Sequence, residues 1–238
     1  MAAVGAGVTI ANGRLAKGLT LLVCLVIIGA VTVWLPRAAH RAFVRGDPGR
    51  SALWYWILRR MLLDPAARAA VEVSLAACAI ARDDFVGARR RLERVGVQRL
   101  SEAARSAWLN NMAYALARAG TDPAAALARS DEAIALRPEV AGFRHTRGMV
   151  LLALGRLDDA IRELDAVWDA HGGEEPLLEA ERCYDLGNAW RRKGEREYAR
   201  DYFERTQRAA PGSRWASRAA EELGARPEPA GAVLPDLV

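Results

Sequence analysis

Signals for catalysis are scarce in this chain of 238 residues. None of its three histidines, His40, His145 and His171, lies at metal-ligand spacing from a cysteine or a carboxylate. The sequence contains neither a Gly-x-Ser-x-Gly nucleophile turn nor a glycine-rich phosphate loop. We therefore expect no catalytic, metal-binding or cofactor-binding residue, and we expect that the protein is not an enzyme.

Cysteines, aromatic residues and strand signals are also few. Cys24, Cys78 and Cys183 are too far apart for a CxxC or metal motif, so we expect reduced core residues; these thiols are compatible with either redox compartment. Aromatic residues make up 7% of the chain, alternating β-branched segments do not persist, and alanine and arginine are abundant. Because small residues let helix backbones approach closely, this composition predicts an all-α fold.

Positive charge is concentrated in one segment. The net charge of +5 hides a balance of +7 over residues 36–100 and of −4 over residues 101–238. A basic segment beside a membrane span is often held near anionic lipid. Nucleic-acid binding by the arginines of residues 89–99 is the competing interpretation, but no nucleic-acid-binding motif accompanies them. We therefore expect no nucleic-acid partner.

A long apolar run lies near the N-terminus. Residues 19–35 carry no charge, and such a run is at the short end of what spans a bilayer as a helix, roughly 17–25 residues. Trp34 stands where an interfacial aromatic residue is expected. A cleaved signal peptide is the alternative, but its apolar region is usually shorter and ends at a small-x-small site. We predict a retained transmembrane helix over residues 19–35, after a flexible N-terminus over residues 1–18.

The charges that flank this run predict its orientation. Arg14 and Lys17 precede it, and a larger membrane-proximal basic group follows it: Arg37, Arg41, Arg45 and Arg50. Because cytoplasmic flanks carry the excess of Lys and Arg, we expect the C-terminal part in the cytoplasm, with the opposite side of the membrane as the alternative. Residues 36–65 read as a basic, tryptophan-rich neck. Within it, residues 51–63 either lie at the membrane interface or cover the end of the following domain.

One pattern recurs through the rest of the chain. Its clearest copy has a large–small pair, a turn, and a small residue early in the next helix: Leu186–Gly187, Trp190, Gly194, Ala199, Phe203 and Pro211. Weaker copies precede it, and the small residues that open the second helices are separated by 38, 34 and 39 positions: Ala88, Ala126, Ala160 and Ala199. A period close to 34 residues indicates stacked helix pairs, which bury their apolar faces only against their neighbours.

These residues and their spacing resemble those of tetratricopeptide-repeat (TPR) proteins over residues 66–224. The resemblance implies a right-handed α-solenoid of about four helix pairs, at residues 66–100, 105–139, 141–173 and 178–211. Residues 213–224 form an amphipathic helix similar to the C-terminal cap of that family, and the proline-bearing tail, residues 225–238, is expected to be disordered. With the apolar run included, the chain resembles bacterial membrane-tethered TPR proteins.

In TPR proteins the first helices of successive units line a concave groove that holds a partner. Carried onto this sequence, the positions between their core residues form the predicted groove: Asn110, Asn111, Tyr114, Arg118, His145, Met149, Leu152, Tyr184, Asn188, Arg191 and Arg192. The resemblance implies that Asn188 hydrogen-bonds the backbone of a bound peptide, since an amide both donates and accepts. The family's clamp for a terminal carboxylate is not expected, because Ala70, Val73 and Ala77 leave the first unit's face apolar. A groove that holds a helix or an extended segment fits better.

The resemblance therefore implies a membrane-anchored scaffold or adaptor that recruits a protein partner, itself expected at the membrane. Its role would lie in assembly or maturation of a membrane or envelope complex. The implied location is the bacterial inner membrane, with the TPR domain in the cytoplasm and the periplasm as the alternative. A structural accessory subunit, held in a larger complex by its anchor and convex surfaces, is the second hypothesis.

Overall fold

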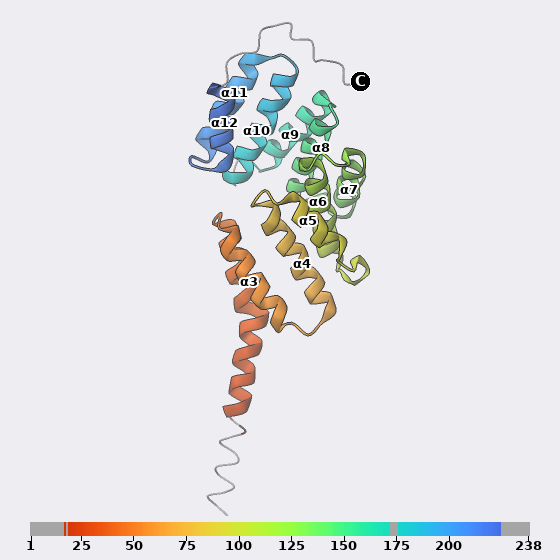
Figure 1. Ribbon diagram of the computed structural model, residues 1–238, viewed down its shortest axis with the longest axis vertical. Helices are drawn as coiled ribbons and strands as arrows, with labels where there is room; N and C mark the ends of the chain where they lie inside the picture. The colour runs from red at the N-terminus through yellow and green to blue at the C-terminus, as the bar shows by residue number, and fades with distance from the viewer. Residues whose placement is uncertain (1–16, 18, 172–175, 225–238) are drawn as a thin grey trace, which may run out of the picture. The chain divides into compact units, whose positions relative to one another are not determined.

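Every regular element in the described part of the chain is a helix. The computed structural model describes Lys17, residues 19–171 and residues 176–224, so most of the predicted flexible N-terminus and the whole predicted tail lie outside the described residues. The elements follow in this order: η1 (Ala30–Trp34), α2 (Leu35–Val44), α3 (Pro48–Met61), α4 (Pro65–Ile80), α5 (Phe85–Glu93), η2 (Val97–Arg99), α6 (Glu102–Arg118), α7 (Pro123–Leu136), α8 (Ala141–Ala153), α9 (Leu157–His171), α10 (Pro176–Arg192), α11 (Arg196–Ala209) and α12 (Arg214–Gly224) (Figure 1).

The chain forms two compact units, and the boundary between them lies inside α6. Unit 1 comprises residues 1–115 and unit 2 comprises residues 116–238. The structure thus places a boundary within the segment that the sequence pattern treats as one domain.

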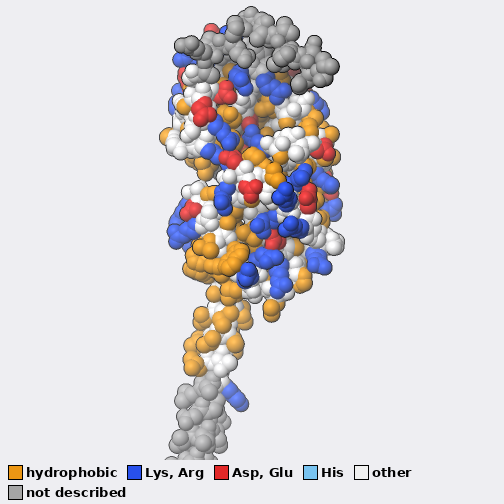
Figure 2. All heavy atoms as spheres, in the orientation of Figure 1, with side chains coloured by type: hydrophobic (Ala, Val, Ile, Leu, Met, Phe, Trp, Pro, Cys, Tyr) orange, Lys and Arg blue, Asp and Glu red, His pale blue; other side chains and the backbone are white. Residues whose placement is uncertain are grey.

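A continuous helix from Leu19 to Val44 opens the described part of unit 1, and by length and composition it could cross a membrane. The large apolar side chains of its first part are exposed, 65% for Leu19 and 56% for Leu25, and apolar side chains cover the visible face of this part in Figure 2. The π-helical turn η1 interrupts the α-helical hydrogen bonding just before Pro36, which cannot donate a backbone hydrogen bond. The apolar run therefore continues into the basic segment without a break in the helix.

Helix α3 returns alongside α2 and packs on α4, the first helix of the repeat region. Leu58 of α3 is buried with Leu35 of α2 and with Leu75 of α4. This contact supports the interpretation that residues 51–63 cover the end of the repeats. Leu53 and Trp56 of α3 nevertheless remain about half exposed, so an interfacial role for its outer surface stays a prediction.

Short turns connect the two helices of each pair, and each turn contains one residue with a left-handed backbone. These residues recur at the repeat period: Asp83 (φ 61°), Gly120 (φ 65°), Gly155 (φ 76°) and Gly194 (φ 85°). Glycine adopts this conformation without steric cost, and aspartate tolerates it better than most residues. The turns are therefore a second periodic feature, independent of the apolar pattern.

Small residues allow the helices of a pair to approach closely, as the repeat pattern predicts. A Cβ atom at Gly148 would lie 2.7 Å from Cγ of Leu164, and one at Gly187 would lie 2.6 Å from Cε1 of Phe203. Ala160, which opens the second helix of its pair, is fully buried. These contacts define how α8 packs on α9 and how α10 packs on α11.

Helix α12 closes the described end of unit 2. Trp215 is buried against Ala180 of α10 and Ala210, while Ala219 is buried against Phe203 of α11. The amphipathic helix predicted at residues 213–224 thus buries its apolar face on the last helix pair, as a solvating cap requires.

Candidate partner-binding surface

In unit 1, the predicted groove positions of α6 face the interior. The amide nitrogen of Asn111 donates to the backbone oxygen of Val73 at 3.4 Å. The Tyr114 ring is buried, with its centre 6.1 Å from that of Phe85. The amide oxygen of Asn110 is buried and accepts no hydrogen bond from the described residues. Asn111 and Tyr114 thus link α6 to earlier helices of the unit rather than forming an open surface.

In unit 2, a buried group of charged side chains joins α6, α8 and α10; we call it the charged cluster, and it comprises Arg118, His145, Glu181 and Asp185. The Arg118 guanidinium donates to a carboxylate oxygen of Glu181 at 3.0 Å and to one of Asp185 at 2.9 Å. Nε2 of His145 lies 3.6 Å from an Asp185 oxygen. Two predicted groove residues, Arg118 and His145, are thus brought together by acidic partners on the third helix.

Aromatic rings surround the charged cluster. The Arg118 guanidinium lies 5.1 Å from the ring centre of Trp215 on α12, which is a cation–π distance. Tyr184 places its ring centre 5.4 Å from that of Trp215 and 5.9 Å from that of Phe203. Arg118 is therefore held between carboxylates and the indole, which leaves it little freedom to reach a partner.

The carboxyl group of Asp185 is the most buried charge of this cluster. Burial raises the pKa of Asp185 above its usual range, while the positive charge of Arg118 and the neighbouring His145 oppose that rise. One of its oxygens accepts no hydrogen bond from the described residues. A buried carboxylate of this kind depends on its partner, so loss of Arg118 would leave an uncompensated charge.

Metal binding is the chemistry that this arrangement first suggests. One ligand atom each from His145, Glu181 and Asp185 lie within 4.8 Å of one another. However, the Arg118 guanidinium already contacts both carboxylates, so it supplies the positive charge that a cation would bring. The two carboxylates are therefore already paired with a positive charge, which does not favour a metal ion at this site.

Met149 and Leu152 of α8 are core residues of unit 2. Both are buried, and Leu152 packs with Leu164 and Leu186. The backbone oxygen of Leu152 also accepts a hydrogen bond from the Arg192 side chain. The structure therefore offers no exposed surface at these two predicted groove positions.

The exposed part of the predicted groove lies at the C-terminal end of α10. The Asn188 amide donates to the backbone oxygen of Tyr184 at 2.9 Å, within its own helix. Arg191 lies 3.6 Å from a carboxylate oxygen of Glu222 on α12. Arg191 and Arg192 are exposed, while Tyr184 and Asn188 are half-buried. A partner could contact these four residues without a rearrangement of the core.

Three residues of the charged cluster and its surroundings were not predicted from the sequence as site residues: Glu181, Asp185 and Trp215. A signal for the two acids was present, because Glu181, Asp185 and Asn188 follow the i, i+4, i+7 spacing of one helix face. A face that carries two acids on a first helix, with His145 on another, suggests a buried polar contact. Trp215 lies in the predicted cap helix, and no local signal in the sequence indicates its contact with Arg118.

The four arginines that the sequence predicts near a membrane lie on α2 and at the start of α3, three of them within six residues of the turn between these helices. Arg37 and Arg41 belong to α2, Arg45 caps its C-terminal end, and Arg50 lies in the first turn of α3. All four are exposed.

Comparison with known proteins supports the architecture and leaves the partner open. A thermophilic TPR protein of Thermus thermophilus matches with a TM-score of 0.57 and 17% identity, over 79% of this chain and 96% of that one. YrrB, described as a TPR protein with an unusual peptide-binding site, matches with a TM-score of 0.44 and 19% identity, over 77% of this chain and 88% of that one. No family model and no curated protein matches the sequence. The described helices therefore have a TPR-like repeat fold.

Proposed function

We propose that the protein is a membrane-anchored TPR adaptor that recruits a protein partner for assembly or maturation of a membrane complex. The observation that carries this proposal is the long, exposed apolar helix Leu19–Val44, which is joined through α3 to a TPR-like repeat fold. Exposed side chains such as Leu22 and Val26 have no buried role in the described chain, and a bilayer would cover them. The repeat fold supplies a scaffold for binding another protein.

The proposed location is the bacterial inner membrane, with the repeats in the cytoplasm. The basic side chains that follow the apolar run support this orientation. The exposed end of α10 supports partner binding, because Tyr184, Asn188, Arg191 and Arg192 offer aromatic, amide and basic groups on a rigid helix.

Site-specific photo-crosslinking tests the partner-binding surface. A photoreactive residue placed at Arg191 of the full chain in native membranes should yield one dominant crosslinked protein. The matched control is Arg200 of α11, whose side chain is 75% exposed and makes only a local ion pair with Glu204. Equal crosslinking from the two positions would remove the end of α10 as the binding surface.

Asn188→Ala provides an independent test of the same surface. The amide hydrogen bond of Asn188 is confined to its own helix, so its loss should change stability little. The variant should bind the crosslinked partner more weakly, with an unchanged melting temperature. Full affinity would exclude Asn188 from the binding surface.

A structural accessory subunit is the second candidate function. It is favoured by the burial of four predicted groove residues: Tyr114, His145, Met149 and Leu152. Because buried side chains are not accessible to a partner, a partner would contact other faces of the repeats. A subunit should co-purify with its complex at fixed stoichiometry in mild detergent. An adaptor should instead appear at variable stoichiometry and be absent from the mature complex.

A further inference from the structure

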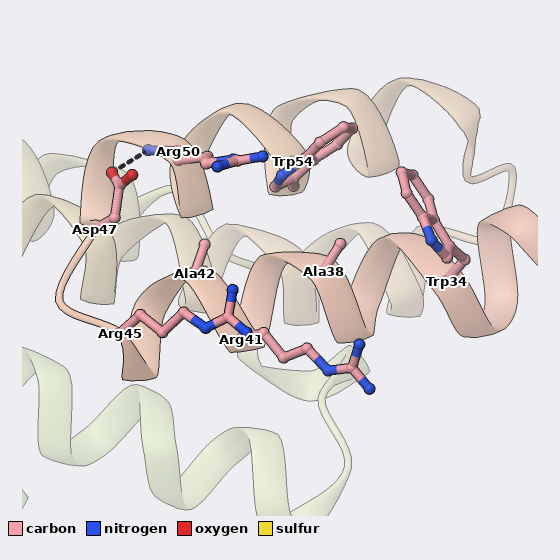
Figure 3. A pocket seen from close by; sticks show the side chains of 8 residues that line it. All are labelled: Trp34, Ala38, Arg41, Ala42, Arg45, Asp47, Arg50 and Trp54. Atoms are coloured by element: carbon pink, nitrogen blue, oxygen red, sulfur yellow. Dashed lines mark hydrogen bonds between the residues drawn. The ribbon is translucent and has the colours of Figure 1, made fainter.

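Helices α2 and α3 enclose a hollow of about 340 Å³, which we call the arginine pocket. Figure 3 shows it between the two helices, with Asp47 near the turn at one end and Trp34 and Trp54 at the other. The two indole rings meet edge to face with their centres 5.1 Å apart. The lining residues are Trp34, Ala38, Arg41, Ala42, Arg45, Asp47, Arg50 and Trp54.

Among the described residues, no acidic side chain forms an ion pair with the arginines of the arginine pocket. Its lining carries three arginines and one aspartate. Asp47 caps α3 by accepting a hydrogen bond from the backbone N–H of Arg50 at 2.8 Å. Arg41, Arg45 and Arg50 form no ion pair with any described residue, whereas Arg91 of the same unit pairs with Glu72 at 2.6 Å. The pocket thus presents an excess of positive charge to an anion from outside the described chain.

The side-chain directions aim this charge at the apolar run. In Figure 3 the side chains of Arg41 and Arg45 extend along α2 toward the end that carries Trp34, and that of Arg50 extends along α3 toward Trp54. Side chains on a helix incline toward its N-terminus, which for α2 is the end joined to the apolar helix. Arg41 is seven residues beyond Trp34, about 10 Å along the helix, so its flexible side chain can reach the headgroup layer.

We propose that the arginine pocket binds the phosphate of an anionic phospholipid headgroup. The three guanidinium groups hold the phosphate oxygens, and the indoles of Trp34 and Trp54 lie against the glycerol and the first acyl carbons. Guanidinium groups match phosphate geometry, and tryptophan is enriched at the depth where headgroups meet hydrocarbon. This inference rests on the proposed membrane anchorage.

A lipid fits the pocket better than an acidic peptide for two reasons. The indole end of the hollow adjoins the apolar helix, so a ligand there needs both an anionic and an apolar part. The neighbouring Leu53 and Trp56 on α3 are also about half exposed, which continues the apolar surface beside the pocket. A glutamate-rich peptide would satisfy the arginines and leave these side chains in water.

Lipid retention by the full chain tests the proposal. The protein is reconstituted in bilayers of equal phosphatidylcholine and phosphatidylglycerol, extracted in mild detergent, and weighed intact by native mass spectrometry with its bound lipids. Wild-type protein should retain phosphatidylglycerol preferentially. The triple variant Arg41→Ala, Arg45→Ala, Arg50→Ala should lose roughly tenfold or more of this retention, because each arginine near an anionic surface is worth about fivefold in binding.

The matched control removes the same charge from unit 1 outside the pocket: Arg37→Ala, Arg90→Ala, Arg94→Ala. Arg37 lies on α2 but does not line the pocket, and all three side chains are exposed. The control should retain phosphatidylglycerol as the wild type does. An equal loss of phosphatidylglycerol retention in both triple variants would show that only the total charge matters, and it would overturn the pocket. Unchanged retention in both variants would also overturn the pocket.

Two further measurements keep the outcomes distinct. Arg45→Gln, a milder change that keeps a polar side chain, should lower retention severalfold with an unchanged melting temperature. Saturable binding of a glutamate-rich peptide in phosphatidylcholine alone, abolished by the pocket triple and without any phosphatidylglycerol preference, would overturn the lipid assignment. Failure of the wild type to insert into the bilayer would contradict the proposed function itself. If the wild type inserts and the two triple variants retain phosphatidylglycerol equally, only the pocket is contradicted.

Discussion

Gly148 and Gly187 determine how closely the two helices of a pair can approach. At both positions an added methyl group would overlap a large side chain of the second helix, Leu164 or Phe203. Phe203 is itself buried, so its ring has little room to move. The repeated pattern of large and small residues therefore reflects a contact in each of these pairs, in which a glycine of the first helix makes room for a large side chain of the second.

Gly187→Ala should destabilise unit 2 by about 1–3 kcal/mol, because the new Cβ overpacks the contact with Phe203. Chemical denaturation of the full chain in detergent measures the change. The control is Gly142→Ala in α8, where a Cβ meets no atom within 4 Å; a helix prefers alanine, so this variant should be neutral or slightly stabilised. Equal unfolding midpoints for the two variants would contradict the assigned packing.

Cys183 should resist alkylation in the folded protein. Burial, followed by the hydrogen bond from its thiol to Glu179, raises the pKa of Cys183 to about 12. Only the thiolate reacts, so at pH 8 iodoacetamide should label Cys183 after denaturation and not before. Peptide mapping by mass spectrometry measures the labelled fraction, and rapid labelling of the native protein would refute the buried position.

The same thiol makes stability depend on pH. An ordinary cysteine has a pKa of roughly 8.5, so the unfolded chain loses this proton at a lower pH than the folded chain does. The contribution is fully present below the unfolded pKa and is lost as the pH rises toward about 12. Cys183→Ala should flatten this alkaline decline, as measured by the melting temperature between neutral and alkaline pH.

For the helix pairs, a substitution at a left-handed turn glycine measures backbone strain without a change in packing. Gly194 has a φ of 85° and open space around an added Cβ. Gly194→Ala should therefore cost about 1–2 kcal/mol through backbone strain alone. Gly142→Ala makes the same substitution in equally open space within α8, and it should not destabilise. A neutral Gly194→Ala would show that the turn relaxes.

The elements of the repeats could be predicted from the sequence because their signals are local. Each signal depends only on residues of its own helix pair. Examples are the small residue Ala160, the turn glycine Gly155 and the prolines that begin helices, such as Pro123. The turn inside the neck was missed, although Asp47–Pro48 has the same cap and proline as Asp64–Pro65.

The charged cluster could not be predicted because its contacts are not local. Arg118 and Asp185 are 67 residues apart in the chain. Their pairing depends on how α6 packs beside α10, which no spacing in the sequence specifies. The repeat pattern therefore predicted Arg118 and His145 in an open groove, whereas in the structure His145 is buried and Arg118 is half-buried, both beside carboxylates. Partner contact at these two residues stays a prediction.

For the whole molecule, the proposed orientation in the membrane rests on the charges that flank the apolar helix. The proposed cytoplasmic location requires the basic side of the apolar helix to stay on the inner face of the membrane. A reporter fused at Val238 that is active only in the cytoplasm should be active. Replacing Arg37, Arg41, Arg45 and Arg50 together by glutamine should reduce that activity, and activity of a periplasm-specific reporter in the wild type would reverse the topology.

The intact mass of the protein in carbonate-washed membranes shows whether the apolar helix is a retained membrane anchor. A retained anchor predicts the full chain of 25.9 kDa in the membrane pellet. Val26→Arg, a charge in the middle of the apolar run, should weaken this retention, since an arginine at the centre of a span costs about 2.5–3.5 kcal/mol. A shorter chain, cleaved after the apolar run and recovered in the soluble fraction, would contradict the account.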